Sequence, residues 1–136
     1  MTLVQCGKYE LKIWSKGDFS TEGARVASYS LYEEGNQVGA VCTLAENVVK
    51  DIKTIPSDRG HGTKFLELLM KRAKTLGYNS FKAESVIGQG STTKEQEQNQ
   101  RKMEHLLKKL RFRQTNKDEN NWEINLENVD TAKIGC

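Results

Sequence analysis

The segment from Asp51 to Ala83 constrains the fold of this chain more than any other, because it predicts a strand, a helix and a second strand in direct succession. Val and Ile are frequent from 47 to 55, and apolar residues then recur at helical spacing from Gly62 to Gly77. A strand pattern follows at 80–86. Since a crossover of this kind is right-handed, the sequence predicts a pair of parallel strands, neighbours or near-neighbours in the sheet, next to a helix.

The loop that opens this helix carries Arg59, Gly60, His61 and Gly62, and Lys64 follows in the first turn. Glycine lets a backbone approach an anion closely, and the first N–H groups of a helix lack intrahelical partners and lie at the positive end of the helix dipole. Such a loop is suited to a phosphate group. Ordinary strand-to-helix turns also use glycine, so the loop alone leaves both interpretations open.

Periodicity in the rest of the chain predicts a mixed sheet with a second helix. Thr92 and Glu95 form a capping-box pattern, and the helix that they begin has no apolar residue from Lys94 to Lys102. The first half of that helix is therefore expected to be exposed or to face something polar. The predicted elements are strands at 8–14, 24–32, 37–44 and 47–55, a helix from Gly62 to Gly77, a strand at 80–86, a helix from Thr92, and a hairpin of strands at 111–115 and 122–126.

The composition is that of a folded, soluble chain. With 136 residues, of which 36% are hydrophobic and 29% charged, the sequence predicts a single domain over 1–126 and a loose tail at 127–136. The N-terminus has no apolar signal region, and no window is long and apolar enough to cross a membrane. We therefore expect a cytoplasmic protein without a membrane partner.

Cysteine and histidine usage argues against a disulfide framework and against a metal site. Cys6, Cys42 and Cys136 are odd in number and far apart, which is typical of free thiols in a reducing compartment. The only histidines are His61 and His105, so no metal is expected.

The net charge of +3 is too small to predict nucleic-acid binding without a concentrated patch. The densest basic run, at 108–113, is also explained by the end of a helix, where cations suit the dipole. A basic domain that binds nucleic acid through this run is therefore only a third hypothesis.

Two local sequences resemble motifs of the GNAT acetyltransferase superfamily. Motif A of that family reads Arg or Gln, two residues, Gly, one residue, then Gly or Ala before a helix. Residues 57–64 resemble it in two alternative registers, one that begins at Arg59 and one that begins at Ser57. Residues 106–112 resemble motif B, usually Leu-Tyr-x-x-x-Gly-Phe, with Leu107 in place of the tyrosine. The predicted order of elements is also similar to the GNAT order.

The resemblance implies a GNAT-like α/β fold, in which a central, mostly antiparallel twisted sheet contains a parallel splayed strand pair and has flanking helices. It implies an N-acetyltransferase with acetyl-CoA as co-substrate, whose pyrophosphate lies on the loop and whose pantetheine follows the splayed strand. The implied cofactor-binding residues are Ile52, Lys53, Thr54, Arg59, Gly60, His61, Gly62, Thr63, Lys64 and Asn99. His61 is expected to contribute its backbone N–H rather than its imidazole. Thr63 either caps the helix or binds phosphate, and a solvated helix face explains Asn99 equally well.

In this family the amine attacks the thioester directly, which needs a base for the ammonium proton and benefits from an acid beside the leaving thiolate. By resemblance, Glu46 occupies the place of a strand glutamate in histone-type members, and Glu84 and Asp51 are the next candidates. Each also fits an ordinary exposed or ion-paired carboxylate. The usual acid is replaced by Leu107, so the alternative function is a catalytically weak or inactive module that binds acyl-CoA or a protein.

The expected partner is an amine substrate, either a small molecule or a protein lysine or N-terminus. Asp18, Glu22, Glu33 and Glu34 are expected near the acceptor side, where they would favour a cationic substrate. A homodimer through exposed edge strands is also compatible with this fold.

Overall fold

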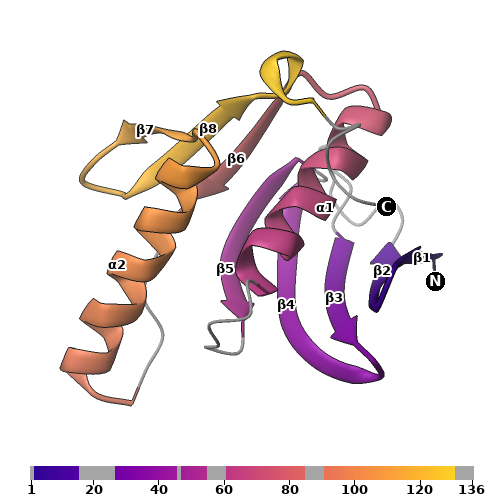
Figure 1. Cartoon of the computed structure of the whole chain (residues 1–136). Coiled ribbons are helices and arrows are strands. Elements are labelled where there is room, and N and C mark those ends of the chain that lie inside the picture. The colour runs from indigo at the N-terminus through magenta and orange to yellow at the C-terminus, as the bar shows by residue number, and fades with distance from the viewer. Residues whose placement is uncertain (1, 16–26, 46, 55–60, 85–90, 131–136) are drawn as a thin grey trace.

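The computed structural model describes residues 2–15, 27–45, 47–54, 61–84 and 91–130. These residues form one eight-stranded sheet and two α-helices (Figure 1). The elements are β1 (Thr2–Cys6), β2 (Tyr9–Ser15), β3 (Ala27–Glu33), β4 (Asn36–Ala45), β5 (Val48–Thr54), α1 (His61–Thr75), β6 (Ser80–Glu84), α2 (Thr93–Lys109), β7 (Arg113–Asn116), β8 (Asn121–Asn125) and the 3-10 helix η1 (Leu126–Asn128).

The strand order is β1-β2-β3-β4-β5-β6-β8-β7. Every neighbouring pair is antiparallel except β5 and β6, which are parallel and are connected through α1. This arrangement confirms the predicted mixed sheet with a strand–helix–strand crossover. The parallel pair lies in the interior of the sheet, with β1 and β7 at the two edges.

The described part of the parallel pair is short. It consists of the partners Val48 with Lys82, Val49 with Ala83, and Lys50 with Glu84, after which β6 ends. Beyond Lys50, β5 also changes register against β4, because Ala40 is paired with Lys53 while Cys42 is paired with Lys50. The extra residue on β5 is a bulge, and bulges bend the strand that carries them. Figure 1 shows β5 continuing past the last described residue of β6.

The helix α1 covers the sheet with one apolar face. Phe65, Leu66 and Ala73 are fully buried, and burial of a large apolar side chain stabilises the fold by about 1.5–3 kcal/mol. The helix ends at Thr75, two residues before the predicted Gly77, which has a φ of 97°. The N–H of Tyr78 donates to the carbonyl of Ala73 at 3.0 Å, which closes the last turn in the manner of a Schellman motif.

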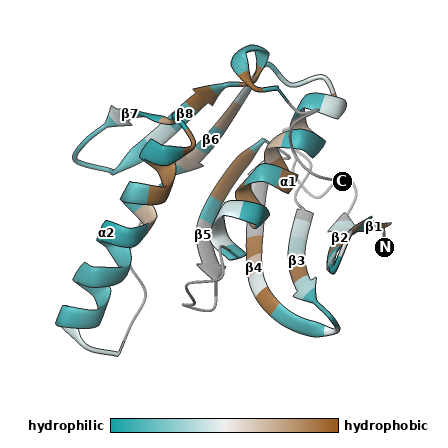
Figure 2. Ribbon diagram, in the orientation of Figure 1, coloured by the Kyte–Doolittle hydropathy of each residue, from teal (hydrophilic) through white to brown (hydrophobic). Residues whose placement is uncertain are grey.

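The helix α2 is attached to the core by its C-terminal half. Thr92 is its N-cap, and the side-chain oxygen of Thr92 accepts a hydrogen bond from the N–H of Glu95 at 3.1 Å. The carboxylate of Glu95 binds Ser91 rather than Thr92, so the predicted capping box is formed in a modified version. Residues 91–98 are all exposed, and Figure 2 shows this half of α2 as hydrophilic. The prediction of an exposed first half is therefore confirmed.

Two features differ from the sequence prediction. The edge strand β1 has no counterpart among the predicted strands, because most of its side chains are exposed and give no alternation of apolar and polar residues. Cys6 is disulfide-bonded, so the prediction of free thiols is wrong for this residue. Among the residues that the structure describes, no helix combines the length and apolar character needed to cross a membrane.

Candidate functional site

The candidate site begins where the described pairing of β5 with β6 ends. On the side of β5 that faces β6, the described residues include no partner for Asp51–Thr54. On the side that faces β4, Lys53 and Thr54 are still paired. Backbone N–H and C=O groups need a hydrogen-bonding partner wherever they are shielded from water. An extended ligand that lies along this side of β5 could therefore bind as an added strand does.

The first turn of α1 forms the second part of the candidate site. The helix begins at His61, one residue before the predicted start, and Gly62, Thr63 and Lys64 are partly exposed. No acidic residue occurs in this turn, whereas α2 has Glu95 in its first turn. Helices usually favour acidic residues at this position because of the dipole. Because this first turn has no acidic residue of its own and contains Lys64, it is suited to bind an anionic ligand.

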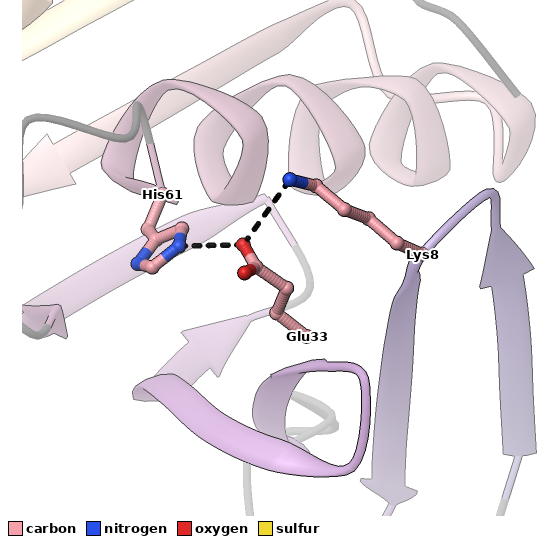
Figure 3. Close-up of polar contacts among 3 residues, drawn as sticks. All are labelled: Lys8, Glu33 and His61. Atoms are coloured by element: carbon pink, nitrogen blue, oxygen red, sulfur yellow. Dashed lines mark hydrogen bonds and ion pairs between the residues drawn. The ribbon is translucent and has the colours of Figure 1, made fainter.

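The side chain of His61 turns away from this exposed surface into the protein. Its Nε2 lies 2.7 Å from Oε2 of Glu33, and the Nζ of Lys8 lies 3.7 Å from the same oxygen (Figure 3). His61 is 5% exposed and Glu33 is 8% exposed. The ring of Tyr9 meets the imidazole edge to face, with centroids 6.0 Å apart. We call Lys8, Tyr9, Glu33 and His61 the Glu33 cluster.

The Glu33 cluster keeps its carboxylate ionised. Burial alone would raise the pKa of Glu33, but hydrogen bonds from His61 and Tyr9 and the positive charge of Lys8 outweigh burial and lower the pKa below its ordinary value. An ionised carboxylate only accepts hydrogen bonds. The Nε2 of His61 is therefore the ring nitrogen that carries a hydrogen, and it donates a hydrogen bond to Glu33.

The predicted catalytic carboxylates are described only in part. Glu84 is the last residue of β6, and its Oε2 lies 3.9 Å from the Nζ of Lys50, so it is ion-paired at the last described pair of β5 and β6. Asp51 follows Lys50 on β5, but its side chain lies outside the described residues, as does Glu46. The choice among the three therefore remains a prediction.

The predicted cofactor-binding residues fall into three groups. Ile52, Lys53 and Thr54 form the end of β5, and residues 61–64 form the first turn of α1, so the chain brings these two groups to consecutive elements. Arg59 and Gly60 lie outside the described residues. Asn99 lies on α2, partly buried, just beyond the exposed residues 91–98.

The motif B segment has a structural role in this protein. Leu107, at the position of the family's tyrosine, is fully buried in the core. Arg111, at the position of the family's glycine, has a φ of 71°, and the N–H of Phe112 donates to the carbonyl of Leu107 at 2.9 Å. The segment therefore ends α2 in the way that the Gly-Phe pair of motif B would end it. Leu107 supplies no hydroxyl group.

Sequence reasoning missed the Glu33 cluster. Glu33 was expected near the acceptor side, but its carboxylate contacts His61 instead. One signal was available, because Tyr29, Leu31 and Glu33 alternate along β3 and so share the inward face. An inward glutamate needs a partner, but the sequence does not say which residue supplies it.

A hollow of about 1070 Å³ lies elsewhere on the molecule. Its lining comes from α1, the C-terminal end of α2, β7, β8 and η1, and from Ser80 at the start of β6. Glu84, beside the candidate site, is at the opposite end of β6. The hollow contains none of the predicted site residues and mixes acidic with basic side chains, so it does not define the site.

Comparison with known proteins identifies the fold class. No protein-family model matches the sequence. No curated protein matches it either. Among solved structures, the N-acetyltransferase PseH of Campylobacter jejuni is similar, with a TM-score of 0.52 at 10% sequence identity over 83% of this chain and 94% of that chain.

This similarity confirms the predicted fold class. The described residues have a GNAT-like fold, with a mixed sheet, one parallel strand pair and two helices, and an N-acetyltransferase shares it. At this level of identity the likeness concerns the fold, and function has to be argued from the site.

Proposed function

We propose that the protein is an N-acetyltransferase that transfers an acetyl group from acetyl-CoA to an amine acceptor. The observation that carries this proposal is the bulge that bends β5 after Lys50, beyond its last described pair with β6, on the element that precedes α1. It places a strand edge that no described residue of β6 pairs and an anion-compatible helix N-terminus on consecutive elements. Acetyl-CoA joins an extended amide chain, which could lie along β5, to a diphosphate, which could bind at the start of α1. Its groups therefore follow the same order as these two elements.

In the proposed reaction, the acceptor nitrogen attacks the thioester carbonyl carbon within a ternary complex. The new C–N bond forms, the C–S bond breaks, and the departing thiolate takes up a proton to give the free thiol. A carboxylate must take the proton that the amine loses, for which Glu46, Glu84 and Asp51 are the candidates. Since Leu107 has no hydroxyl group, the thiolate would leave without an acid from that position, which its pKa of about 8.5 permits.

Calorimetric titration with acetyl-CoA and a thiol-release assay over a panel of amines test the proposal together. We expect saturable binding of acetyl-CoA and release of free thiol with at least one amine. A folded protein that binds no acetyl-CoA would contradict the proposal. The amine that supports turnover would also identify the acceptor class.

A charge placed in the first turn of α1 tests the diphosphate site. Thr63→Glu adds an acidic residue where the helix has none, so the free energy of unfolding should be unchanged or rise by about 0.5 kcal/mol. Affinity for acetyl-CoA should nevertheless fall at least about tenfold, because the carboxylate repels the diphosphate. The matched control is Gln96→Glu, which makes the same charge change in the first turn of α2 and should leave affinity unchanged.

The three carboxylates can be ranked by Glu46→Gln, Glu84→Gln and Asp51→Asn. The variant that removes the base should lower kcat by about 10² to 10⁴, while acetyl-CoA binding is unchanged. We expect this result for Glu46→Gln. For Glu84→Gln we expect a small effect, because the carboxylate is already paired with Lys50. Equal kcat values for all three variants and the wild type would remove these residues from the mechanism.

A second candidate function is a binding module of the same fold with little or no catalysis. The burial of Leu107 at the tyrosine position favours it, because it leaves the leaving group without an acid from motif B. Acetyl-CoA binding without thiol release from any amine would support the module over the enzyme.

A further inference from the structure

We propose that Glu33 is a positioning residue that acts through His61 to orient the first turn of α1 toward the coenzyme diphosphate. This inference rests on the proposed function and adds a residue that no resemblance indicates. Glu33 is not expected to touch the coenzyme, because its carboxylate is buried against His61.

The Glu33 cluster joins three segments that are far apart in the sequence. Lys8 belongs to the turn between β1 and β2, Glu33 is the last residue of β3, and His61 is the first residue of α1. The N–H of Glu34 also donates to the carbonyl of Lys8 at 3.0 Å, which ties the two hairpins together. The start of α1 is therefore fixed to the ends of two hairpins rather than to β5 alone.

His61 is suited to transmit this position, because the two parts of the residue face different surroundings. Its imidazole is buried and donates to Glu33, while its backbone N–H is one of the first N–H groups of the helix, which have no intrahelical partner. Fixing the ring fixes the Cα and hence the direction of the amides of His61, Gly62 and Thr63. A hydrogen bond to an ionised carboxylate is short and directional, so it holds a residue better than an apolar contact does.

The charges of the cluster also protect the proposed anion site. A lone carboxylate near a helix N-terminus would oppose the binding of a diphosphate. The positive charge of Lys8 offsets the charge of Glu33, and the N–H of His61 donates a hydrogen bond to Glu33. The cluster can therefore anchor the helix without making its N-terminus repel an anion.

The test compares two ligands that differ in the diphosphate. Acetyl-CoA contains it, and acetylpantetheine contains only the arm that would lie along β5. In Glu33→Gln, affinity for acetyl-CoA should fall about tenfold, whereas affinity for acetylpantetheine should change by less than about twofold. Glu34→Gln, an exposed neighbour in the same turn, is the matched control and should change neither affinity.

A double-mutant cycle identifies the path of the effect. His61→Leu, which has no hydrogen-bond donor, should reproduce the result of Glu33→Gln, and the double variant should be no weaker than either single variant, because both remove the bond to an ionised carboxylate. His105→Leu, on the exposed face of α2, is the control for loss of a histidine. Additive losses would show that Glu33 does not act through His61 and would overturn the proposal.

Other outcomes are equally decisive. If Glu33→Gln weakens both ligands equally, or leaves acetyl-CoA affinity unchanged, Glu33 only stabilises the fold and the inference is wrong. If Glu33→Gln does not fold, Lys8→Met gives the same comparison, since the Lys8 side chain is 53% exposed, and a loss for acetyl-CoA alone of about threefold is expected. An unchanged affinity in that variant would then refute the inference. If the wild type itself binds no acetyl-CoA, the proposed function has failed instead.

Discussion

Arg111 shows at the scale of one residue how this chain departs from the motif B pattern that its sequence resembles. It adopts a φ of 71°, in the left-handed region where side chains other than glycine are strained. Its N–H donates to the carbonyl of Lys108 at 3.0 Å, so the conformation closes the end of α2. The family's glycine would meet this backbone requirement without strain, whereas the arginine keeps the turn at an energetic cost.

Replacing Arg111 with glycine should therefore stabilise the protein. We expect Arg111→Gly to raise the free energy of unfolding by about 0.5 to 1 kcal/mol, since relief of strain exceeds the added freedom of the unfolded chain. Arg113→Gly, which removes the same charge from the strand β7, should lower it by about 0.5 to 1 kcal/mol. Urea denaturation measures both changes, and a loss of stability in Arg111→Gly would refute the argument.

Glu33 should make stability depend on pH in the acidic range. Its folded-state pKa lies below the unfolded value of about 4.3, so the stabilisation is complete above that value and is lost as the pH falls through the folded pKa. The wild type should therefore lose its advantage over Glu33→Gln as the pH falls below the unfolded-state pKa of about 4.3. Urea denaturation across this range measures the difference, and a difference that is independent of pH would contradict the assignment.

At the scale of elements, α2 combines a packed end with an exposed one. Leu107 is buried, and Met103, Leu106 and Leu110 pack against the core, but residues 91–98 are exposed. The exposed half gains nothing from tertiary packing, so its helical state depends on the cap and on the packed half. Sequence periodicity predicted this division because the apolar stripe begins at Met103.

Loss of the cap should accordingly unfold the exposed half of α2 first. Thr92→Ala removes the acceptor for the N–H of Glu95 and should lower the free energy of unfolding by about 1 kcal/mol. Thr93→Ala, one residue later, removes a similar side chain outside the cap and should have little effect. Far-ultraviolet circular dichroism and urea denaturation follow the change, and equal effects of both variants would show that the cap does not matter.

At the scale of the whole molecule, local patterns predicted the elements and long-range contacts escaped prediction. Alternation and helical spacing are properties of neighbouring residues, so the strands from β2 to β8 and both helices could be predicted, whereas β1 lacked the alternation. Of the residues predicted for the candidate site, the structure describes the backbone of Ile52–Thr54 and the first turn of α1, while Arg59 and Gly60 lie outside the described residues. The contact of Glu33 with His61 joins residues 28 positions apart, and no periodicity reports such a pair.

The proposed site also predicts a pattern of hydrogen exchange over the whole chain. Acetyl-CoA should slow exchange of the amides of Asp51–Thr54 and of the first turn of α1, because both would gain partners or lose solvent. The edge strand β7 and the exposed half of α2 should exchange at unchanged rates. Mass spectrometry with and without acetyl-CoA measures this pattern, and slowing that is confined to other regions would place the ligand elsewhere.

The brevity of the parallel pair has a consequence for the assembly of the sheet. Strands β1 to β5 and strands β6 to β8 meet through the partners Val48 with Lys82, Val49 with Ala83, and Lys50 with Glu84. In the described part of the chain, backbone bonding across this seam is therefore sparse, and the side chains of α1 and the core contribute most of the cohesion between the two sub-sheets. A ligand that contacts both sub-sheets at the candidate site would stabilise their association. Without that ligand, local unfolding should begin along this seam.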